Sequence, residues 1–421
     1  MTPVAAPERS GPLRATLVVP GSKSATARGY LLAALADAPS VLRGVLDARD
    51  TRLMRAALTA LGVGFTDLGP DQVRVQPPDA FTPSDIEVGL AGTLMRFLPP
   101  VAALAAGASR FDGDPEARLR PVRPLLDGLA QAGVRIDHPE ALPFTVRGTG
   151  SVAGGRVSID ASGSSQFVSG LLLAGARFDA GLDLAHLGGT LPSRPHIGLT
   201  VAMLRDRGVR IDQIEGEDRW RVAPGPIAAR DETIEPDLIN AATFLAAPLL
   251  LGGEVTTAWP RHTVQAADTI LEVLSALGGT VRTASDSVTV SGTGSVRGAD
   301  LDLSLASELT CVAAALLAVA DAPGSIRGVG HVRGHETDRL AALESEINAL
   351  GGEVSQTADG LRITPLPLRG GIFHTYADHR MAHAGALLGL AVPGLRLDDV
   401  SCTTKTLPDF PGLWSRLVDG A

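Results

Sequence analysis

Two helical patterns alternate along the chain with a period near 70 residues. In the first pattern, an amphipathic helix ends in glycine and leads into a short β-branched run. The glycines are Gly62, Gly133, Gly208, Gly278 and Gly351, with spacings of 71, 75, 70 and 73 residues. Residues 413–420 fit a shortened sixth copy. The polar faces of these helices predict that they cover the outside of the protein.

The second pattern is a helix rich in alanine and leucine that opens with small or polar residues. Its copies begin at positions 22, 91, 164, 237, 306 and 377, which are 69, 73, 73, 69 and 71 residues apart. These helices are apolar nearly all round and should therefore be buried. Short runs that favour strands lie at residues 15–20, 156–160, 287–292 and 361–364.

Two patterns in register, six times over, indicate six copies of a β/α unit. A chain of 421 residues is too long for one compact core, and a polar, proline-rich stretch from Pro224 to Glu235 divides the copies evenly. We therefore predict an α/β fold with two similar domains of three repeats each. The predicted domains are residues 20–230, and residues 1–19 together with 231–421, so that the strand expected at 13–20 belongs to the second domain.

Composition excludes several classes of protein. A net charge of −9 and only 4% aromatic residues argue against a nucleic-acid or anionic membrane partner. We see neither a signal peptide nor an apolar run of the roughly 20 residues that span a bilayer. Cys311 and Cys402 form no disulfide framework, and metal or dinucleotide motifs are lacking. We expect a cytoplasmic protein without metal or cofactor.

Candidate chemistry gathers where the buried helices begin. Free N–H groups and the positive end of the helix dipole lie there, so several converging helix starts make an anion site. The GSKS sequence around Lys23 lacks the glycines of a nucleotide-binding P-loop. A serine cap with a solvated lysine is the simpler interpretation, yet Lys23 and Lys405 are the only lysines among 37 basic residues. This rarity favours a role in phosphate binding.

The motifs that carry these residues resemble one family. PGSKS with Arg28, AGT with Arg96, RP at 120–121, SSQF at 164–167, HETDR, DHRMA and KTLPDF occur in this order between about residues 13 and 414. The chain resembles the 5-enolpyruvylshikimate-3-phosphate (EPSP) synthases. The resemblance implies two domains of three βαβαββ units, an inside-out α/β barrel, with the active site in the inter-domain cleft. It also implies transfer of the enolpyruvyl group of phosphoenolpyruvate to the 5-hydroxyl of shikimate 3-phosphate.

The resemblance implies roles for individual residues as well. The residues implied for shikimate 3-phosphate are Lys23, Ser24, Arg28, Ser164, Ser165, Gln166, Ser193, Glu308 and His335. Those implied for phosphoenolpyruvate are Lys23, Gly92, Arg120, Gln166, Arg339, Arg380 and Lys405. We expect catalysis by Glu308, Lys23, Lys405 and His335, with Glu308 taking the hydroxyl proton. The expected partners are these two small molecules alone, and we expect a monomer.

Some positions depart from the family, and other functions compete. The family commonly has Asp where Glu308 stands and Lys where His335 stands; His331 and His196 also differ from the usual residues. UDP-N-acetylglucosamine enolpyruvyltransferases share the fold, but their loop cysteine has no counterpart within residues 108–123. A non-catalytic anion-binding protein on the same scaffold is the alternative from a different class. The residues leave open which group protonates phosphoenolpyruvate, and whether this is the primary pathway enzyme or a specialised paralogue.

Overall fold

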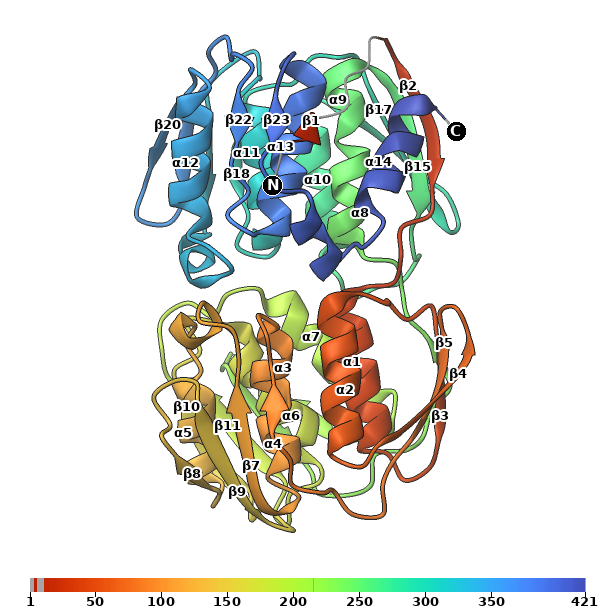
Figure 1. Ribbon diagram of the computed structural model, residues 1–421, viewed down its shortest axis with the longest axis vertical. Coiled ribbons are helices and arrows are strands. Elements are labelled where there is room, and N and C mark those ends of the chain that lie inside the picture. The colour runs from red at the N-terminus through yellow and green to blue at the C-terminus, as the bar shows by residue number, and fades with distance from the viewer. Residues whose placement is uncertain (1–3, 6–10, 215, 421) are drawn as a thin grey trace. The chain divides into compact units, whose positions relative to one another are not determined.

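The computed structural model describes residues 4–5, 11–214 and 216–420, and the chain forms two units (Figure 1). Unit 1 comprises Met1–Pro20 and Pro236–Ala421, and unit 2 comprises Gly21–Glu235. The chain leaves unit 1 after Pro20 and returns to it at Pro236. Within unit 2 the Ser22 N–H donates to the Glu235 carbonyl at 2.7 Å, and within unit 1 the Asp237 N–H donates to the Pro20 carbonyl at 2.9 Å.

The apolar helices form the interior of each unit, as their sequence pattern predicts. In unit 2 they are α1 (Lys23–Ala34), α3 (Gly92–Phe97) with α4 (Pro99–Ala102), and α6 (Ser165–Gly175). In unit 1 they are α8 (Leu238–Leu245) with α9 (Ala247–Leu251), α11 (Thr310–Leu317) and α13 (His379–Ala391). Two of the predicted helices are each split into two segments. Pro99 and Pro248 lie in the first turn of the second segment, where a missing N–H is tolerated.

The amphipathic helices bury one face and expose the other. They are α2 (Arg49–Ala60), α5 (Arg123–Gln131) and α7 (Arg194–Arg205) in unit 2, and α10 (Ala267–Ala276), α12 (Arg339–Ala349) and α14 (Phe410–Asp419) in unit 1. Gly420 follows α14 with φ of 78°, as Gly62 follows α2 with φ of 100°. Glycine adopts this left-handed conformation at little cost, and a sixth copy of the helix–glycine pattern is therefore confirmed.

The three sheets of unit 2 repeat one topology. Their strand orders are β14–β3–β5–β4, β6–β7–β9–β8 and β10–β11–β13–β12. In each sheet the first pair is parallel and the other pairs are antiparallel. The strands are β3 (Ser40–Arg43), β4 (Gly64–Gly69), β5 (Gln72–Gln76), β6 (Ile86–Glu87), β7 (Ala106–Asp112), β8 (Arg135–Asp137), β9 (Phe144–Thr149), β10 (Gly155–Ile159), β11 (Leu182–His186), β12 (Ile211–Gln213), β13 (Arg219–Val222) and β14 (Glu232–Thr233).

Unit 1 repeats the same topology twice and adds a smaller sheet. The strand orders are β2–β15–β17–β16, β18–β19–β21–β20 and β1–β23–β22. The strands are β1 (Val4–Ala5), β2 (Leu13–Leu17), β15 (Gly253–Ala258), β16 (Thr280–Thr283), β17 (Ser287–Gly292), β18 (Asp300–Asp302), β19 (Gly324–Arg327), β20 (Glu353–Gln356), β21 (Leu361–Thr364), β22 (Ile372–Phe373) and β23 (Arg396–Leu397). The strand expected near residues 13–20 is β2, which pairs in parallel with β15 of unit 1.

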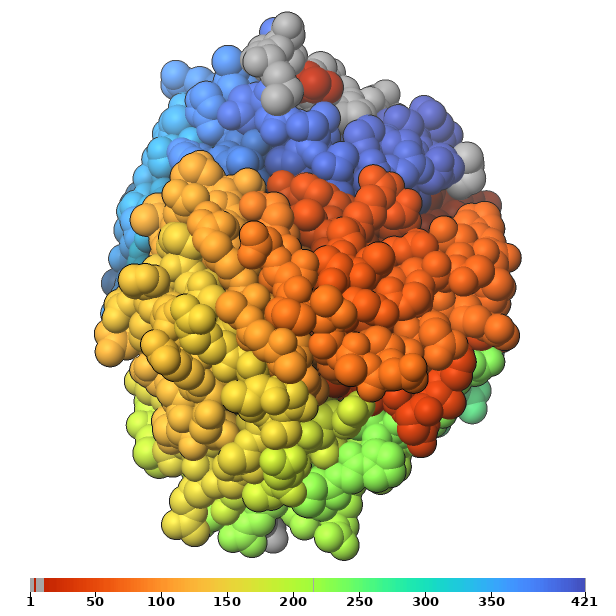
Figure 2. Space-filling view, turned by 60° about the horizontal axis from the view of Figure 1, so that its bottom comes forward, coloured from red at the N-terminus to blue at the C-terminus, as the bar shows by residue number. Residues whose placement is uncertain are grey.

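Each unit has its own hydrophobic core. Leu31, Phe97 and Leu171 belong to the core of unit 2, whereas Leu245 and Leu387 belong to that of unit 1. Figure 2 shows part of the surface of unit 2. Segments from its successive repeats lie side by side there and are seen as orange, gold and yellow-green areas. Among the described residues, no helix combines the length and apolar character needed to cross a membrane.

Candidate functional site

Arg28, in the second turn of α1, links this helix to α6 and α7 in unit 2. Its guanidinium donates to the Thr200 hydroxyl at 2.8 Å, the Ser169 hydroxyl at 3.3 Å and the His196 carbonyl at 3.1 Å. Ser169 and Thr200 lie in the second turns of α6 and α7, and His196 lies in the first turn of α7, so the N-terminal halves of α1, α6 and α7 meet at Arg28. Arg28 is 1% exposed, and burial lowers its pKa to about 9. These contacts give Arg28 a role in holding the helix starts together.

Lys23 is the first residue of α1, directly after the helix cap Ser22. The Ser22 side chain accepts the N–H of Ala25 at 3.3 Å, so the serine cap of the simpler interpretation is present. The lysine itself is not fully solvated, because its side chain is 20% exposed and its Nζ lies 3.6 Å from Oδ2 of Asp50. Asp50 is buried in the first turn of α2. An ammonium at a helix start beside a buried carboxylate can hold an anion and can also exchange a proton.

Arg96 orients Gln166 at the start of α6. The Arg96 side chain is buried and donates to the Pro121 carbonyl at 2.9 Å and to Oε1 of Gln166 at 2.8 Å. It also lies over the ring of Phe167, 5.3 Å from its centroid. Because Oε1 of Gln166 accepts from an arginine, the other end of its amide is the donor NH₂ group. Gln166 can therefore donate to an anionic ligand.

Gly92 gives Arg120 room at the start of α3. A Cβ at position 92 would lie 2.8 Å from Nη2 of Arg120. Nη1 of Arg120 donates to the Leu90 carbonyl at 3.0 Å. Its Nε is buried and has no hydrogen-bond partner among the described residues. A buried guanidinium N–H without an acceptor is costly, and a bound anion would remove that cost.

Serines mark the starts of the other two helices. Ser164 caps α6 and accepts the N–H of Gln166 at 3.3 Å, while the next residue, Ser165, is buried. Ser193 precedes α7 with a left-handed φ of 48°. A non-glycine residue in this region costs free energy and often marks a functional site. The Ser24 carbonyl accepts from Arg28 at 3.0 Å, which links the first turn of α1 to this arginine.

Arg339, the first residue of α12, has a network of charged contacts in unit 1. It donates to Asp378 at 2.8 and 3.2 Å and to Glu336 at 3.0 Å. Arg339 is 2% exposed. Burial alone would lower its pKa, but the carboxylates of Asp378 and Glu336 outweigh burial and raise it. Arg339 therefore stays charged inside the unit.

His335 and Lys405 complete this cluster. Nδ1 of His335 lies 3.0 Å from Nη1 of Arg339. Arginine can only donate, so Nδ1 accepts and the ring proton lies on Nε2. Burial, followed by the positive charge of Arg339, holds the pKa of His335 well below its ordinary value. Lys405, in the short helix η4 (Ser401–Lys405), is buried and pairs with Glu336. A neutral N–H donor and a buried ammonium thus lie beside one arginine.

Arg380 and Glu308 lie at the starts of α13 and α11. Nη1 of Arg380 donates to Oδ1 of Asn240 at 2.8 Å, and burial lowers the pKa of Arg380. Glu308 is half-buried in η2 (Ser307–Leu309), the turn that leads into α11. Next to it, the Ser307 hydroxyl forms a hydrogen bond of 3.0 Å with Nε2 of His331, a residue of η3 (Gly330–Gly334). Each unit therefore presents polar groups at its helix starts.

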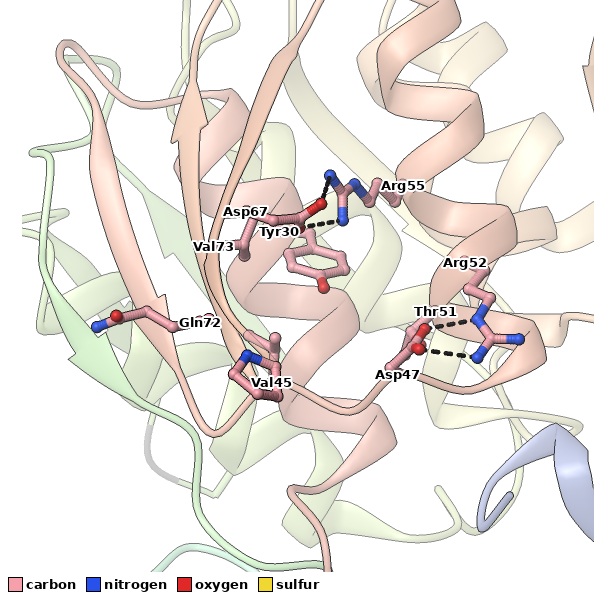
Figure 3. A pocket seen from close by; sticks show the side chains of 11 residues that line it. Tyr30, Val45, Asp47, Thr51, Arg52, Arg55, Asp67, Gln72 and Val73 are labelled. Carbon is pink, nitrogen blue, oxygen red and sulfur yellow. Dashed lines mark hydrogen bonds and ion pairs between the residues drawn. The ribbon is translucent and has the colours of Figure 1, made fainter. Parts of the chain in front are cut away.

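A separate cavity in unit 2 is lined by other residues (Figure 3). Its volume is about 220 Å³, and its walls come from α1, α2, β4, β5 and the loop before α2. The ion pairs Arg52–Asp47 and Arg55–Asp67 flank the ring of Tyr30, as the dashed lines in Figure 3 show. The cavity contains none of the site residues expected from the sequence.

Sequence reasoning missed the acidic and amide partners of the predicted cations. Asp50 pairs with Lys23, Asp378 and Glu336 bind Arg339, and Asn240 accepts from Arg380. Asn240 could have been found, because it stands at the start of the fourth buried helix, the one repeat to which no site residue was assigned. Asp50 gives no such signal, since it belongs to an outer helix.

Comparison with known proteins adds independent information. Residues 7–414 match the family model described as EPSP synthase (3-phosphoshikimate 1-carboxyvinyltransferase). A 3-phosphoshikimate 1-carboxyvinyltransferase of Kocuria rhizophila is 53% identical over 428 residues, which cover 98% of this chain and 96% of that protein.

Two solved structures share the fold. The EPSP synthase of Acinetobacter baumannii superposes with a TM-score of 0.79 at 20% identity, covering 99% of this chain and 97% of that one. The enolpyruvyl transferase NikO of Streptomyces tendae gives a TM-score of 0.77 at 21% identity, covering 99% and 96%. At these identities the likeness concerns the fold, which is the predicted two-domain α/β architecture.

Proposed function

The chain belongs to the EPSP synthase family, and we propose that the polar residues at its helix starts form the active site of this enzyme. The enzyme is a 3-phosphoshikimate 1-carboxyvinyltransferase of the shikimate pathway. It joins C2 of phosphoenolpyruvate to the 5-oxygen of shikimate 3-phosphate and releases phosphate. This membership decides against the two alternatives, a UDP-N-acetylglucosamine enolpyruvyltransferase and a non-catalytic binding protein.

The proposed site for shikimate 3-phosphate draws mainly on unit 2. Its phosphate is held by Lys23 and by the hydroxyls and main-chain N–H groups at the starts of α1, α6 and α7. The support is that Arg28 links the N-terminal halves of these helices. Helix N-termini and hydroxyls suit a phosphate, because they offer donors without needing a metal. The proposed residues are Lys23, Ser24, Arg28, Ser164, Ser165, Gln166 and Ser193, with Glu308 and His335 from unit 1.

The proposed site for phosphoenolpyruvate takes residues from both units. Lys23, Gly92, Arg120 and Gln166 come from unit 2, and Arg339, Arg380 and Lys405 come from unit 1. The observation that carries this proposal is the buried Nε of Arg120, which lacks an acceptor among the described residues. Arginine matches carboxylate and phosphate groups, and phosphoenolpyruvate carries both. The proposal requires one substrate to bind residues of both units, in an inter-domain cleft.

Proposed roles in the chemistry follow from what each side chain can do. Glu308 takes the proton of the attacking 5-hydroxyl. Protonation of C3 of phosphoenolpyruvate makes C2 electrophilic, and Lys23 and Lys405 are the groups able to move that proton, because arginine does not give up its own. Nε2–H of His335 donates to the shikimate ring substituents. Arg339 and Arg380 balance the charge of the carboxylate and phosphate.

A phosphate-release assay tests the proposed base. The wild-type enzyme should release phosphate from phosphoenolpyruvate only when shikimate 3-phosphate is present. Glu308→Gln should keep the affinity for shikimate 3-phosphate within about threefold but lower kcat by about 100-fold or more, the contribution typical of a general base. Glu353→Gln, at an exposed position on β20, is the control and should behave as wild type. Unchanged turnover in Glu308→Gln would exclude Glu308 as the base.

We further propose that the enzyme is a cytoplasmic monomer. All the proposed substrate residues lie on one chain, so no second copy is needed to complete the site. Cys311 and Cys402 are both free thiols, which fits a reducing compartment. Light scattering coupled to size-exclusion chromatography should give the mass of a single chain, 43.3 kDa.

A further inference from the structure

A strained turn precedes the helix that carries Arg380. Tyr376 and Ala377 both have left-handed φ angles, 54° and 53°. Neither is glycine, so each costs free energy that the surroundings must supply. The next residue, Asp378, caps α13 and accepts the N–H of Arg380 at 2.8 Å, and it also accepts from Arg339. The conformation of this turn therefore sets where Asp378 lies, and Asp378 in turn orients the side chain of Arg339 and starts the helix that carries Arg380.

The turn is held from α12 by one buried carboxylate. Glu346 is 3% exposed and accepts two hydrogen bonds from the turn. The main-chain N–H of His374 donates to Oε2 at 2.8 Å, and the Tyr376 hydroxyl donates to Oε1 at 2.6 Å. These bonds fix residues on both sides of Thr375. Hydrogen bonds to a charged acceptor in a buried place are among the stronger ones.

Glu346 and Arg339 lie on the same helix, seven residues apart. This spacing is nearly two full turns, so both side chains lie on one face of α12. Arg339 binds Asp378 after the turn, and Glu346 binds His374 and Tyr376 within it. Asp398, just after β23, accepts the N–H and the hydroxyl of Thr375, both at 2.9 Å. The segment is thus held at three points.

We propose that Glu346 is a positioning residue for phosphoenolpyruvate binding, acting through residues 374–378. It holds the turn in its left-handed form, so that Asp378 can orient Arg339 and start α13 with Arg380 in place. This inference rests on the proposed function of Arg339 and Arg380. Glu346 itself touches only the turn in these contacts, so its loss should change how the arginines are placed without removing them.

Steady-state kinetics separate this role from a general loss of stability. Glu346→Ala should raise KM for phosphoenolpyruvate about tenfold, since small misplacements of binding groups are costly. KM for shikimate 3-phosphate should change less than about twofold. Glu346→Gln keeps one acceptor oxygen for His374 and should lie between Glu346→Ala and wild type. Tyr376→Phe, which removes one bond, should also be intermediate.

A second-site change tests the strained turn directly. Glycine adopts a left-handed φ without steric cost, so Ala377→Gly should allow the turn to keep its conformation when the hydrogen bonds to Glu346 are lost. In the Glu346→Ala background it should recover about half or more of the lost affinity for phosphoenolpyruvate. A purely structural role for Glu346 gives no reason for such a rescue of KM. Failure of the rescue, with KM still raised, would overturn the role of the turn.

Glu344→Ala is the matched control, because Glu344 lies on the same helix and accepts the main-chain N–H of Gln356 at 3.2 Å, away from the turn. It should leave both KM values unchanged.

Arg380→Lys distinguishes a failure of the positioning role of Glu346 from a failure of the proposed phosphoenolpyruvate site. If Arg380→Lys raises KM for phosphoenolpyruvate but Glu346→Ala does not, the proposed site stands and the positioning role is wrong. If Arg380→Lys leaves KM unchanged, the proposed phosphoenolpyruvate site itself is wrong.

Discussion

At the scale of single residues, the identity of a cation matters as much as its charge. The chain uses lysine at only two positions, and both are half-buried or buried beside carboxylates: Lys23 next to Asp50, and Lys405 next to Glu336. Everywhere else the cation is arginine. An ammonium is compact and can lose its proton, whereas a guanidinium is a planar fork that stays charged. This difference leads to a sharp expectation for Lys23.

Lys23→Arg should lower kcat/KM by about 100-fold or more. The longer guanidinium would reach Asp50 with two parallel hydrogen bonds and be drawn away from the substrates. It would also be unable to move a proton. Kinetic assays with both substrates measure the effect, and circular dichroism shows whether the fold is kept. Near-normal activity would mean that lysine at this position is incidental.

Gly92→Ala should impair binding of phosphoenolpyruvate without harming stability. The three atoms nearest the new Cβ all belong to the guanidinium of Arg120, the far end of a flexible side chain, which can shift at little cost to the fold. The shift should raise KM for phosphoenolpyruvate about tenfold or more and change the free energy of unfolding by less than about 0.5 kcal/mol. Gly198→Ala on α7 is the control, because a Cβ there meets nothing within 4 Å. Equal KM values for the two variants would contradict the placement of Arg120.

At the scale of elements, the sequence period predicts the helices well and the contacts between them poorly. The apolar pattern identifies the buried helices and the glycine-ended pattern identifies the outer ones. Both succeed because burial of a helix face and C-capping depend on residues close together in the sequence. The breaks after Leu98 and Ala246 come from nearby prolines and could have been read in advance. The pairing of Lys23 with Asp50 depends on how α1 packs against α2, which no local pattern encodes.

The hydrogen bonds of Arg28 show how much contacts between helices contribute to the free energy of unfolding. Arg28→Lys would lose most of the hydrogen bonds to Thr200, Ser169 and the His196 carbonyl, and one ammonium cannot replace them. We expect a loss of about 3 kcal/mol in the free energy of unfolding, typical of breaking a buried charged network. Urea denaturation measures it. The control is Arg194→Lys, since that arginine is about half exposed in its pair with Asp218 and should cost less than about 1 kcal/mol. Similar losses in both variants would refute a special role for Arg28.

At the scale of the whole molecule, buried histidines should make stability depend on pH. Burial holds the pKa of His383 well below its ordinary value, and its Nε2 has no hydrogen-bond partner among the described residues. Below a pH of about 6.5, the histidine side chain becomes protonated in the unfolded chain but stays neutral in the folded protein. Stability should therefore fall as the pH drops from about 6.5, by up to about 1.4 kcal/mol per pH unit for each such histidine.

His383→Met tests this effect. Methionine has neither the unpaired ring nitrogen nor a group that is protonated on unfolding. The substitution should therefore raise the free energy of unfolding by about 1 kcal/mol at pH 7 and by more at pH 5. Thermal or urea unfolding across this pH range gives the comparison. The exposed His262, replaced by Met, should leave the pH slope unchanged. An unaltered slope in His383→Met would show that His383 is not buried in its neutral form.

Hydrogen exchange should reveal how the two units share the substrates. Shikimate 3-phosphate alone should slow exchange most at the starts of α1, α6 and α7. Adding phosphoenolpyruvate should extend the protection to the starts of α12 and α13 and to residues 401–405. The outer helices α5 and α10 carry no proposed ligand and serve as internal controls. Protection confined to one unit with both substrates bound would contradict a site built from the two.

The placement of β2 also affects how the chain can fold while it is being made. Leu13, Ala15 and Leu17 are buried only once β2 lies beside β15, which begins at Gly253. At about 5–20 residues per second, the ribosome needs roughly 10–50 s to make the residues between them. Unit 2 can fold during that interval, because its residues are continuous from Gly21 to Glu235. Throughout that interval β2 keeps an unpaired edge and an unburied apolar face, which makes this segment the part of the growing chain most open to wrong pairing.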